Sequence, residues 1–287
     1  MTEPGWFTAA IAQEPEHHHL DVKGAGIHYR AWGPKGAPGI ALLHGGAAHS
    51  GWWDHIAPQL ADGHRVIAAD LSGHGDSEWR PEYERSDWAL EVVAAVRAEG
   101  IDPALFIGHS MGGWVSVFAG VLEPDAVSSI IAIDSPLTEA PPEEAPIAAR
   151  PPTKIYPSLD IAVSKFRTVP AQEGNLPYVE HHVALESLHQ VEGGWTWMFD
   201  PGLFGQRGWV RDLIPRLEAP LTLIRCEHGM CDEAMAQRIS QLHRDGITVV
   251  ELPDAGHHAM FDQPEALVSL LRSLTGCEGC PPARQRD

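Results

Sequence analysis

The stretch GHSMGG, residues 108–113, follows a short apolar run at residues 104–107 and precedes a helix-like stretch at residues 114–122. A strand, a Gly-x-Ser-x-Gly turn and a helix in this order form a nucleophile elbow, which presents a serine at the end of a strand. Glycine flanks the serine on both sides because bulky side chains do not fit in so tight a turn. The order therefore predicts that Ser110 is a nucleophile and that the N–H of Met111, at the start of the helix, faces a developing oxyanion.

Apolar runs and helical stretches alternate along most of the chain. The runs that predict strands are residues 40–43, 65–70, 104–107, 128–133, 221–225 and 247–252. The stretches that predict helices are residues 53–60, 88–99, 114–122, 234–243 and 264–274. Continuous apolar runs are typical of strands buried on both faces, so we expect an α/β fold with a mostly parallel sheet. An entry hairpin is expected at residues 17–22 and 27–32, after a loose arm or short lid element at residues 1–16.

Residues 135–215 interrupt this alternation. They begin with a proline-rich stretch, residues 136–152, that cannot form a regular element, and they continue with many aromatic side chains. We therefore expect a core made of residues 1–134 and 216–287, with residues 135–215 inserted as a cap.

Four tryptophans are candidates for the wall of a substrate pocket. Trp52 and Trp53 follow the apolar run at residues 40–43, and Trp195 and Trp197 lie in the expected cap. Aromatic side chains around a site predict an apolar or aromatic substrate. The alternative is that the aromatic residues of the cap form a small core of its own.

A serine needs a base within hydrogen-bond reach and an acid that orients that base. His257 follows the strand expected at residues 247–252, so it lies at the same sheet edge as Ser110 and is the preferred base over its neighbour His258. Asp134 follows the strand expected at residues 128–133 and is the preferred acid. The chain order of serine, acid and histidine agrees with that choice.

Two other carboxylates remain alternatives for the acid. Asp232 and Glu227 both follow the strand expected at residues 221–225. We rank Asp232 second and Glu227 third.

The second oxyanion donor is expected in the loop that follows residues 40–43. Gly46 is the preferred donor of this N–H, and Ala47 is its neighbour. His44 precedes them and is a candidate for the substrate pocket, with the alternative that it holds the loop in place by hydrogen bonds.

Four motifs together resemble the α/β-hydrolase superfamily: HGG at residues 44–46, DLSGHGDS at 70–77, GHSMGG at 108–113 and GH at 256–257. The resemblance implies an eight-stranded, mostly parallel sheet flanked by helices, an inserted helical cap over the site, no cofactor, and hydrolysis through an acyl-serine. The chain departs from the family at Gly229, where one usual position of the acid has no carboxylate; this favours Asp134. Serine in place of aspartate at residue 110 makes haloalkane dehalogenase or epoxide hydrolase activity improbable.

Composition restricts the partners. The chain has 287 residues and a formal net charge of -19, which argues against nucleic acid or an anionic membrane as a partner. Without a signal peptide, a membrane-spanning run or a disulfide-rich pattern, a cytoplasmic protein is expected, as a monomer or a homodimer. We expect no metal site: a helical face with His182, Glu186 and His189 is better explained as a solvated surface, and the CxxC at residues 277–280 lacks a second ligand pair.

The sequence therefore predicts a serine hydrolase that cleaves a carboxylic ester, or a related acyl bond, of a small apolar or aromatic molecule. Acyl transfer and C–C bond hydrolysis on the same three residues are alternatives within enzyme chemistry. A non-catalytic ligand receptor on the same fold is the alternative from another class.

Overall fold

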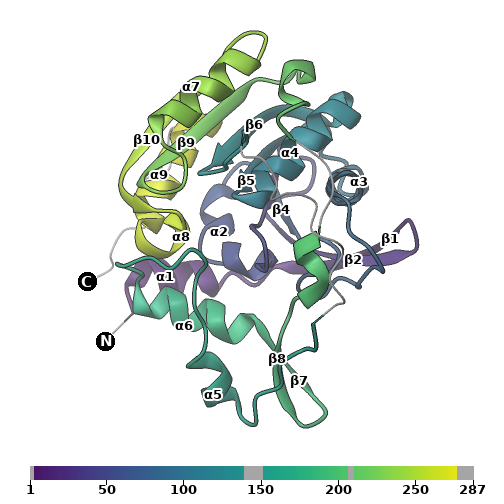
Figure 1. Ribbon diagram of the computed structural model, residues 1–287, viewed down its shortest axis with the longest axis vertical. Coiled ribbons are helices and arrows are strands. Elements are labelled where there is room, and N and C mark those ends of the chain that lie inside the picture. The colour runs from purple at the N-terminus through teal and green to yellow at the C-terminus, as the bar shows by residue number, and fades with distance from the viewer. Residues whose placement is uncertain (1–2, 139–150, 206–209, 277–287) are drawn as a thin grey trace.

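The computed structural model describes residues 3–138, 151–205 and 210–276, and its centre is an eight-stranded sheet with the order β1-β2-β4-β3-β5-β6-β9-β10 (Figure 1). The strands are β1 (Glu16–Val22), β2 (Ala25–Trp32), β3 (Gly39–Leu43), β4 (Arg65–Ala69), β5 (Ala104–His109), β6 (Val127–Ile133), β9 (Leu221–His228) and β10 (Thr248–Gly256). β2 pairs antiparallel with β1 and β4, and all other neighbours are parallel. This confirms the predicted mostly parallel sheet and its entry hairpin.

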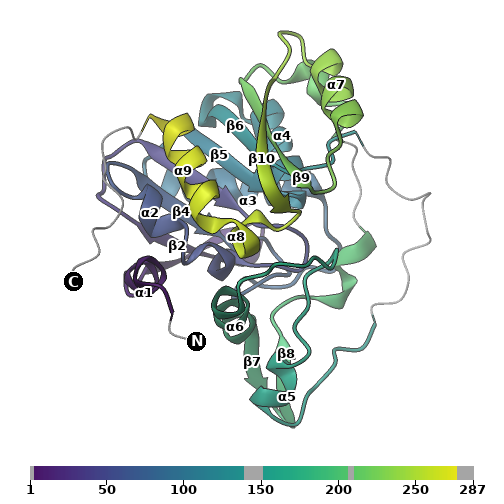
Figure 2. The same ribbon diagram turned by 90° about the vertical axis from the view of Figure 1, so that its left-hand side faces the viewer.

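Helices cover both faces of the sheet, which is why its central strands are apolar along their whole length. The core helices are α1 (Gly5–Ile11), α2 (Ala57–Leu60), α3 (Arg85–Ala98), α4 (Met111–Leu122), α7 (Glu233–Leu242), α8 (Ala259–Asp262) and α9 (Pro264–Thr275). α3, α4 and α7 pack on one face, whereas α1, α2, α8 and α9 pack on the other (Figure 2). Every residue of β3 and β4 is buried between these layers.

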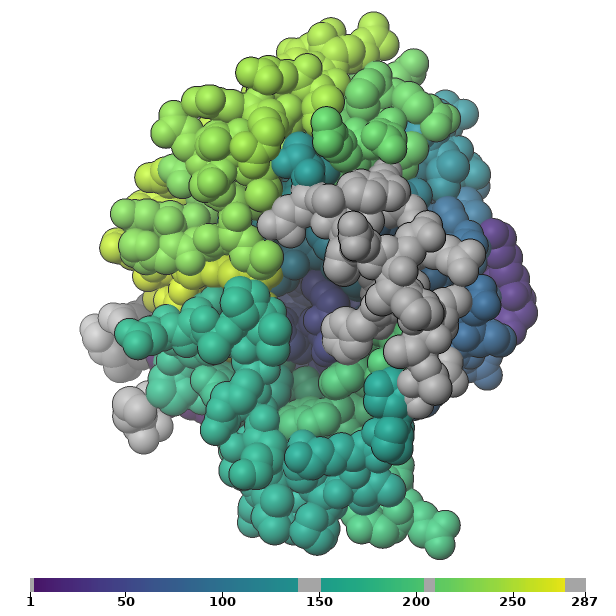
Figure 3. Space-filling model, in the orientation of Figure 1, coloured from purple at the N-terminus to yellow at the C-terminus, as the bar shows by residue number. Residues whose placement is uncertain are grey.

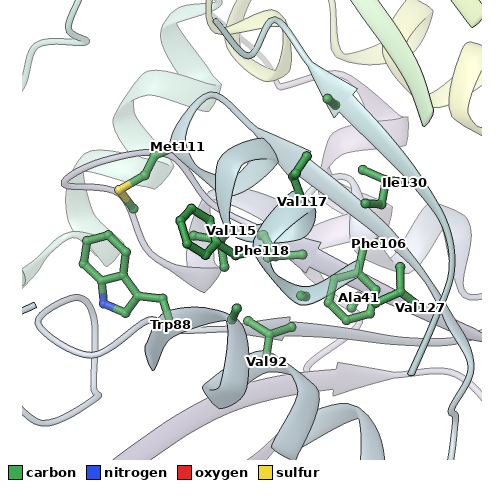
Figure 4. Close-up of a cluster of buried hydrophobic side chains, with 14 of the residues drawn as sticks. Ala41, Trp88, Val92, Phe106, Met111, Val115, Val117, Phe118, Val127 and Ile130 are labelled. Carbon is green, nitrogen blue, oxygen red and sulfur yellow. The ribbon is translucent and has the colours of Figure 1, made fainter. Parts of the chain in front are cut away.

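The helix that carries the elbow is fixed by a close-packed cluster of side chains. Val115 and Phe118 of α4 belong to one buried cluster with Trp88 and Val92 of α3 and Phe106 of β5 (Figure 4). Since interiors pack at nearly crystalline density, such contacts leave the start of α4 little freedom to move. The elbow therefore stands on a rigid support.

Between β6 and β9 the chain leaves the sheet and forms a separate group of elements. These are α5 (Leu159–Val163), α6 (Pro177–Glu186), β7 (Leu188–Val191) and β8 (Gly194–Trp197), which lie together below the sheet (Figures 1 and 3). The antiparallel hairpin of β7 and β8 was not among the predicted elements, which were helical here; Gly193, with φ of 88°, lies in its two-residue turn. Most of the proline-rich stretch lies outside the described residues.

The amino-terminal segment is ordered, which excludes the loose arm that was one of the two expectations for residues 1–16; the other, a short lid element, stays a prediction. Residues Gly5–Ile11 form α1, and Phe7 on this helix is fully buried. Its ring meets Tyr178 of α6 edge to face, with 4.9 Å between the ring centroids. The helix predicted at residues 53–60 is likewise split into a 3-10 turn, Ser50–Trp53, and the short helix α2. No helix in the described parts of the chain is both long and apolar enough to cross a bilayer.

Buried neutral histidines give the fold an expected sensitivity to acid. Burial lowers the pKa of His49 and of His55 to about 4, and burial together with the nearby charge of His257 lowers that of His258 to about 3. In the unfolded chain each of these groups binds a proton below about pH 6.5. The folded state then holds fewer protons than the unfolded state, so the free energy of unfolding decreases as the pH falls from 6.5 toward 4.

At pH 5 we expect each of the three histidines to lower the free energy of unfolding by about 2 kcal/mol, which together is comparable with the whole stability of a domain. Urea unfolding followed by tryptophan fluorescence at pH 7.5 and pH 5.0 measures this loss. His55→Gln should reduce the difference between the two pH values, whereas replacement of the exposed His189 by glutamine should not. An equal urea midpoint at both pH values would contradict the prediction.

Candidate active site

Ser110 lies at the turn between β5 and α4, in a backbone conformation that residues other than glycine rarely adopt. Its φ is 52° and its ψ is -117°, and it directly precedes the first residue of the helix. The turn is crowded on both sides: a side chain at Gly108 would collide with the backbone of Gly112, and one at Gly112 would collide with the carbonyl of Leu43. The two glycines thus allow the strained turn that exposes the serine.

A chain of hydrogen bonds connects Ser110 with His257 and Asp134. The Oγ of Ser110 lies 3.1 Å from Nε2 of His257, and Nδ1 of His257 lies 2.6 Å from Oδ2 of Asp134. The three residues follow β5, β10 and β6, so the parallel strands bring them to one edge of the sheet. Asp134 is fully buried and His257 is 3% exposed. Such an arrangement can take the proton of a serine and stabilise the imidazolium that results.

Backbone groups hold the carboxylate of Asp134 in place. The N–H of Met230 donates to Oδ2 at 2.7 Å, and the N–H of Cys231 donates to Oδ1 at 3.1 Å. The carboxylate therefore accepts from three donors, counting the ring of His257, and these contacts fix its orientation.

The two alternative acids are engaged elsewhere. Asp232 caps α7 and accepts a hydrogen bond from the N–H of Met235 at 2.7 Å, while Glu227 accepts one from the N–H of Asp254 at 2.9 Å. Gly229 occupies the other position at which this family carries the acid. A side chain there would overlap the carboxylate of Asp134, so only glycine fits beside it. Of the three candidates, the structure brings only Asp134 to His257.

Gly46 and Met111 lie near each other beside Ser110. A side chain at Gly46 would meet Sδ of Met111 at 3.9 Å. Within the part of the chain that the structure describes, neither the N–H of Gly46 nor that of Met111 has an acceptor. Both donors are available to an oxyanion.

His44 has no nitrogen left for a substrate. It donates from Nδ1 to the carbonyl of Gly45 at 2.8 Å and accepts at Nε2 from the N–H of Leu71 at 3.1 Å. Burial lowers its pKa, so the ring is neutral in this role. These contacts contradict a polar contact of His44 with substrate and agree with the alternative that it holds the loop in place.

The four tryptophans differ in position. Trp53 is fully buried in the core beneath the site, so it cannot line a pocket. Trp195 is partly buried and packs against the small core of the hairpin, where its backbone pairs with Tyr156, so its place on the pocket wall stays a prediction. Trp52 contacts Phe261 and Phe166, and Trp197 contacts Phe166 from the cap side. The aromatic residues of the cap thus serve partly as its own core.

The loop that carries His257 is clamped by side chains that the sequence analysis did not identify. The N–H of Gly256 donates to Asp262 at 2.6 Å, and Nε2 of His109 donates to the carbonyl of His257 at 2.8 Å. From the expected cap, Oε1 of Gln172 accepts from the N–H of His258 at 2.8 Å. No local sequence pattern identifies Gln172, because it lies 86 residues before His258 along the chain.

Among the described residues, the helical face considered for a metal does not assemble into a site. α6 ends at Glu186, so His189 lies on β7 rather than on the helical face shared by His182 and Glu186. His182 instead approaches Asp54 at 3.3 Å, and Glu186 pairs with Arg30. The CxxC motif falls outside the described residues.

The chain matches the model of the alpha/beta hydrolase family over residues 40–270. It is 28% identical over 270 residues to an esterase of Mycobacterium tuberculosis, covering 88% of this chain and 87% of that protein. It is 30% identical over 253 residues to the 2-(acetamidomethylene)succinate hydrolase of Mesorhizobium japonicum, covering 83% and 87%.

A crystal structure of E-2-(acetamidomethylene)succinate hydrolase is similar to this fold. The TM-score is 0.78 at 21% identity, and the match covers 92% of this chain and all of that one. At this identity the likeness shows the fold alone. The sheet, its helices and the order of the strands therefore have a close counterpart among solved structures.

Proposed function

Since the chain belongs to the alpha/beta hydrolase family, we propose that it is a serine hydrolase that cleaves carboxylic esters of small apolar or aromatic molecules. Curated relatives include an esterase and a lipase, which supports an ester-cleaving hydrolase. The observation that carries the serine mechanism is the hydrogen-bonded chain from Ser110 through His257 to Asp134. Residues 135–215 are proposed as the cap beside this site.

In the proposed first step, Nε2 of His257 takes the proton of Ser110 while Oγ attacks the carbonyl carbon of the ester. The N–H groups of Gly46 and Met111 stabilise the negative charge that develops on the carbonyl oxygen. Asp134 holds the ring of His257 in the tautomer whose Nε2 can accept a proton, and it stabilises the imidazolium.

In the second step, His257 gives its proton to the leaving alcohol as the tetrahedral intermediate collapses to an acyl-serine. Water then attacks the acyl carbon, with His257 again as the base, and the carboxylic acid and free Ser110 are released. No cofactor is needed, because His257 takes a proton from Ser110 and later one from water, and it returns one to the alcohol and one to Ser110.

Apolar side chains near the base support an apolar substrate. The ring of His258, next to the base, contacts Trp52 and Phe261, and Phe166 joins them from the cap. Polar recognition by His44 is not part of the proposal. An acyl chain or an aromatic ring can therefore be bound largely by burial of apolar area.

A panel of p-nitrophenyl esters, thioesters and anilides of graded acyl length tests this function. We expect ester hydrolysis, with a kcat/KM that rises with acyl length until the pocket is full. A fluorophosphonate should label a single serine, and peptide mass spectrometry should identify it as Ser110. Labelling at another serine would contradict the mechanism, and turnover only with an added alcohol or thiol would indicate acyl transfer instead.

A further inference from the structure

Three imidazole rings crowd around the candidate base. The ring centroids of His109, His257 and His258 are 4.7 to 5.2 Å apart, and all three side chains are buried. One ring nitrogen from each lies within 4.8 Å of the other two. A point equally distant from the three nitrogens therefore lies no more than about 2.8 Å from each of them, whereas a zinc–imidazole bond is about 2.0 to 2.1 Å long. Movements of less than about 1 Å would therefore bring the three nitrogens to one metal ion.

The hydrogen bonds of His109 leave the lone pair of its Nδ1 unused, whereas Nε2 of His257 accepts from Ser110 at 3.1 Å, so a metal there displaces the serine hydroxyl. His257 uses Nδ1 toward Asp134, so its Nε2 carries the lone pair. His109 donates from Nε2 to the carbonyl of His257, and no partner occupies its buried Nδ1 among the described residues. Metal-ligating histidines characteristically donate their other N–H to a carboxylate or a backbone carbonyl. Both rings already have this outer contact.

The third ring is also available. The backbone of Val169 and of Pro170 approaches the ring of His258, but neither ring nitrogen has a contact within the described chain that meets the geometry of a hydrogen bond. His258 is 4% exposed, so water satisfies it poorly. A buried imidazole without a partner is an unusual feature for a residue with only a packing role.

We propose that His109, His257 and His258 form an inhibitory site for a divalent transition-metal ion of the zinc class. Three imidazoles suit Zn²⁺, Cu²⁺ and Ni²⁺ rather than Mg²⁺ or Ca²⁺, which prefer oxygen ligands. The metal bonds to the lone pair of His257 Nε2, so this nitrogen no longer accepts the proton of Ser110 and the serine keeps it. The binding of metal rests on the cluster, whereas the inhibition rests also on the proposed function.

Zinc chloride is the probe, used with the full chain against a chromophoric chelator of known affinity. We expect one tightly bound zinc per chain and none with magnesium at equal concentration. His258→Phe and His109→Gln should each weaken the binding about tenfold or more, because each removes a ligand. Circular dichroism identifies a variant that does not fold, and the other variant then decides. The matched control is His189→Phe, an exposed histidine on β7 that should leave the binding of zinc unchanged.

Ester hydrolysis is measured in parallel, and each variant is normalised to its own rate without zinc. Zinc should inhibit the wild type, and the concentration for half inhibition should rise about tenfold or more in both cluster variants. Unchanged zinc affinity in these variants would overturn the inference. Glu227, His228 and Asp254 form a second, exposed group that could hold a metal, so loss of zinc binding in His228→Ala would overturn it as well. If the wild type hydrolyses esters but binds no zinc, the inference is overturned and the proposed function stands. Zinc bound at the cluster without inhibition would overturn the inhibitory role together with the proposed role of His257.

Discussion

Ser110→Ala is expected to lower kcat/KM for the best ester substrate by about 10⁴-fold or more, because the nucleophile is lost while the oxyanion donors remain. The substitution removes one oxygen from a partly exposed side chain, so the free energy of unfolding should change little. Substrate binding should remain nearly as tight. Steady-state kinetics, and equilibrium binding of a non-hydrolysable substrate analogue, measure the two effects separately.

Ser116→Ala is the matched control for this experiment. Ser116 lies on α4, the helix that Ser110 precedes; it is fully buried, and its hydroxyl donates to the carbonyl of Gly112 at 2.8 Å rather than to His257. Its loss should lower stability slightly and leave kcat within a few-fold of the wild type. Substantial ester turnover in Ser110→Ala, after purification away from host esterases, would exclude the serine mechanism.

The elements that the sequence predicted well are those whose signals are local. The strand before Ser110 is a continuous apolar run, and the glycines beside the serine mark a turn that few other residues allow. The positions of Asp134 and His257 followed from one topological fact, that the carboxyl ends of parallel strands meet at one edge. The structure brings these two residues together, as that argument requires.

The features that the sequence analysis missed depend on contacts between distant segments. Nothing near Gln172 indicates that it holds the backbone of His258, and nothing near Phe7 shows that its helix is packed against α6. The sequence makes Trp53 a candidate for the pocket wall, yet it is fully buried in the core, because aromatic residues suit both a core and a binding site. Only the fold distinguishes these two uses. The hairpin of β7 and β8 does have a local signal, because Gly193 lies in its two-residue turn with a positive φ.

Asp134→Asn is expected to lower kcat by about 10³- to 10⁴-fold with a smaller effect on KM. The carboxylate accepts from three donors: the ring of His257 and the N–H groups of Met230 and Cys231. His257 and Met230 share Oδ2, so the NH₂ group of an asparagine faces either the N–H of Cys231 alone or both His257 and Met230. If the conflict falls on His257, the ring takes the wrong tautomer; if it falls on the backbone, the support of the ring is lost. Pre-steady-state kinetics with a p-nitrophenyl ester measure the rate of acylation directly.

Asp232→Asn separates the role of the triad acid from a general loss of negative charge. Asparagine caps helices about as well as aspartate, so this variant should keep both the helix α7 and the activity of the wild type. Gly229→Ala should reproduce part of the defect of Asp134→Asn, because even a methyl group at residue 229 collides with the carboxylate of Asp134. This substitution adds or removes no ionisable group. Wild-type activity in Asp134→Asn together with a loss in Asp232→Asn would transfer the acid role to Asp232. A loss in Asp134→Asn and in Gly229→Ala, with Asp232→Asn unaffected, would instead follow from the geometry, since both damaging changes act on the one carboxylate that His257 contacts.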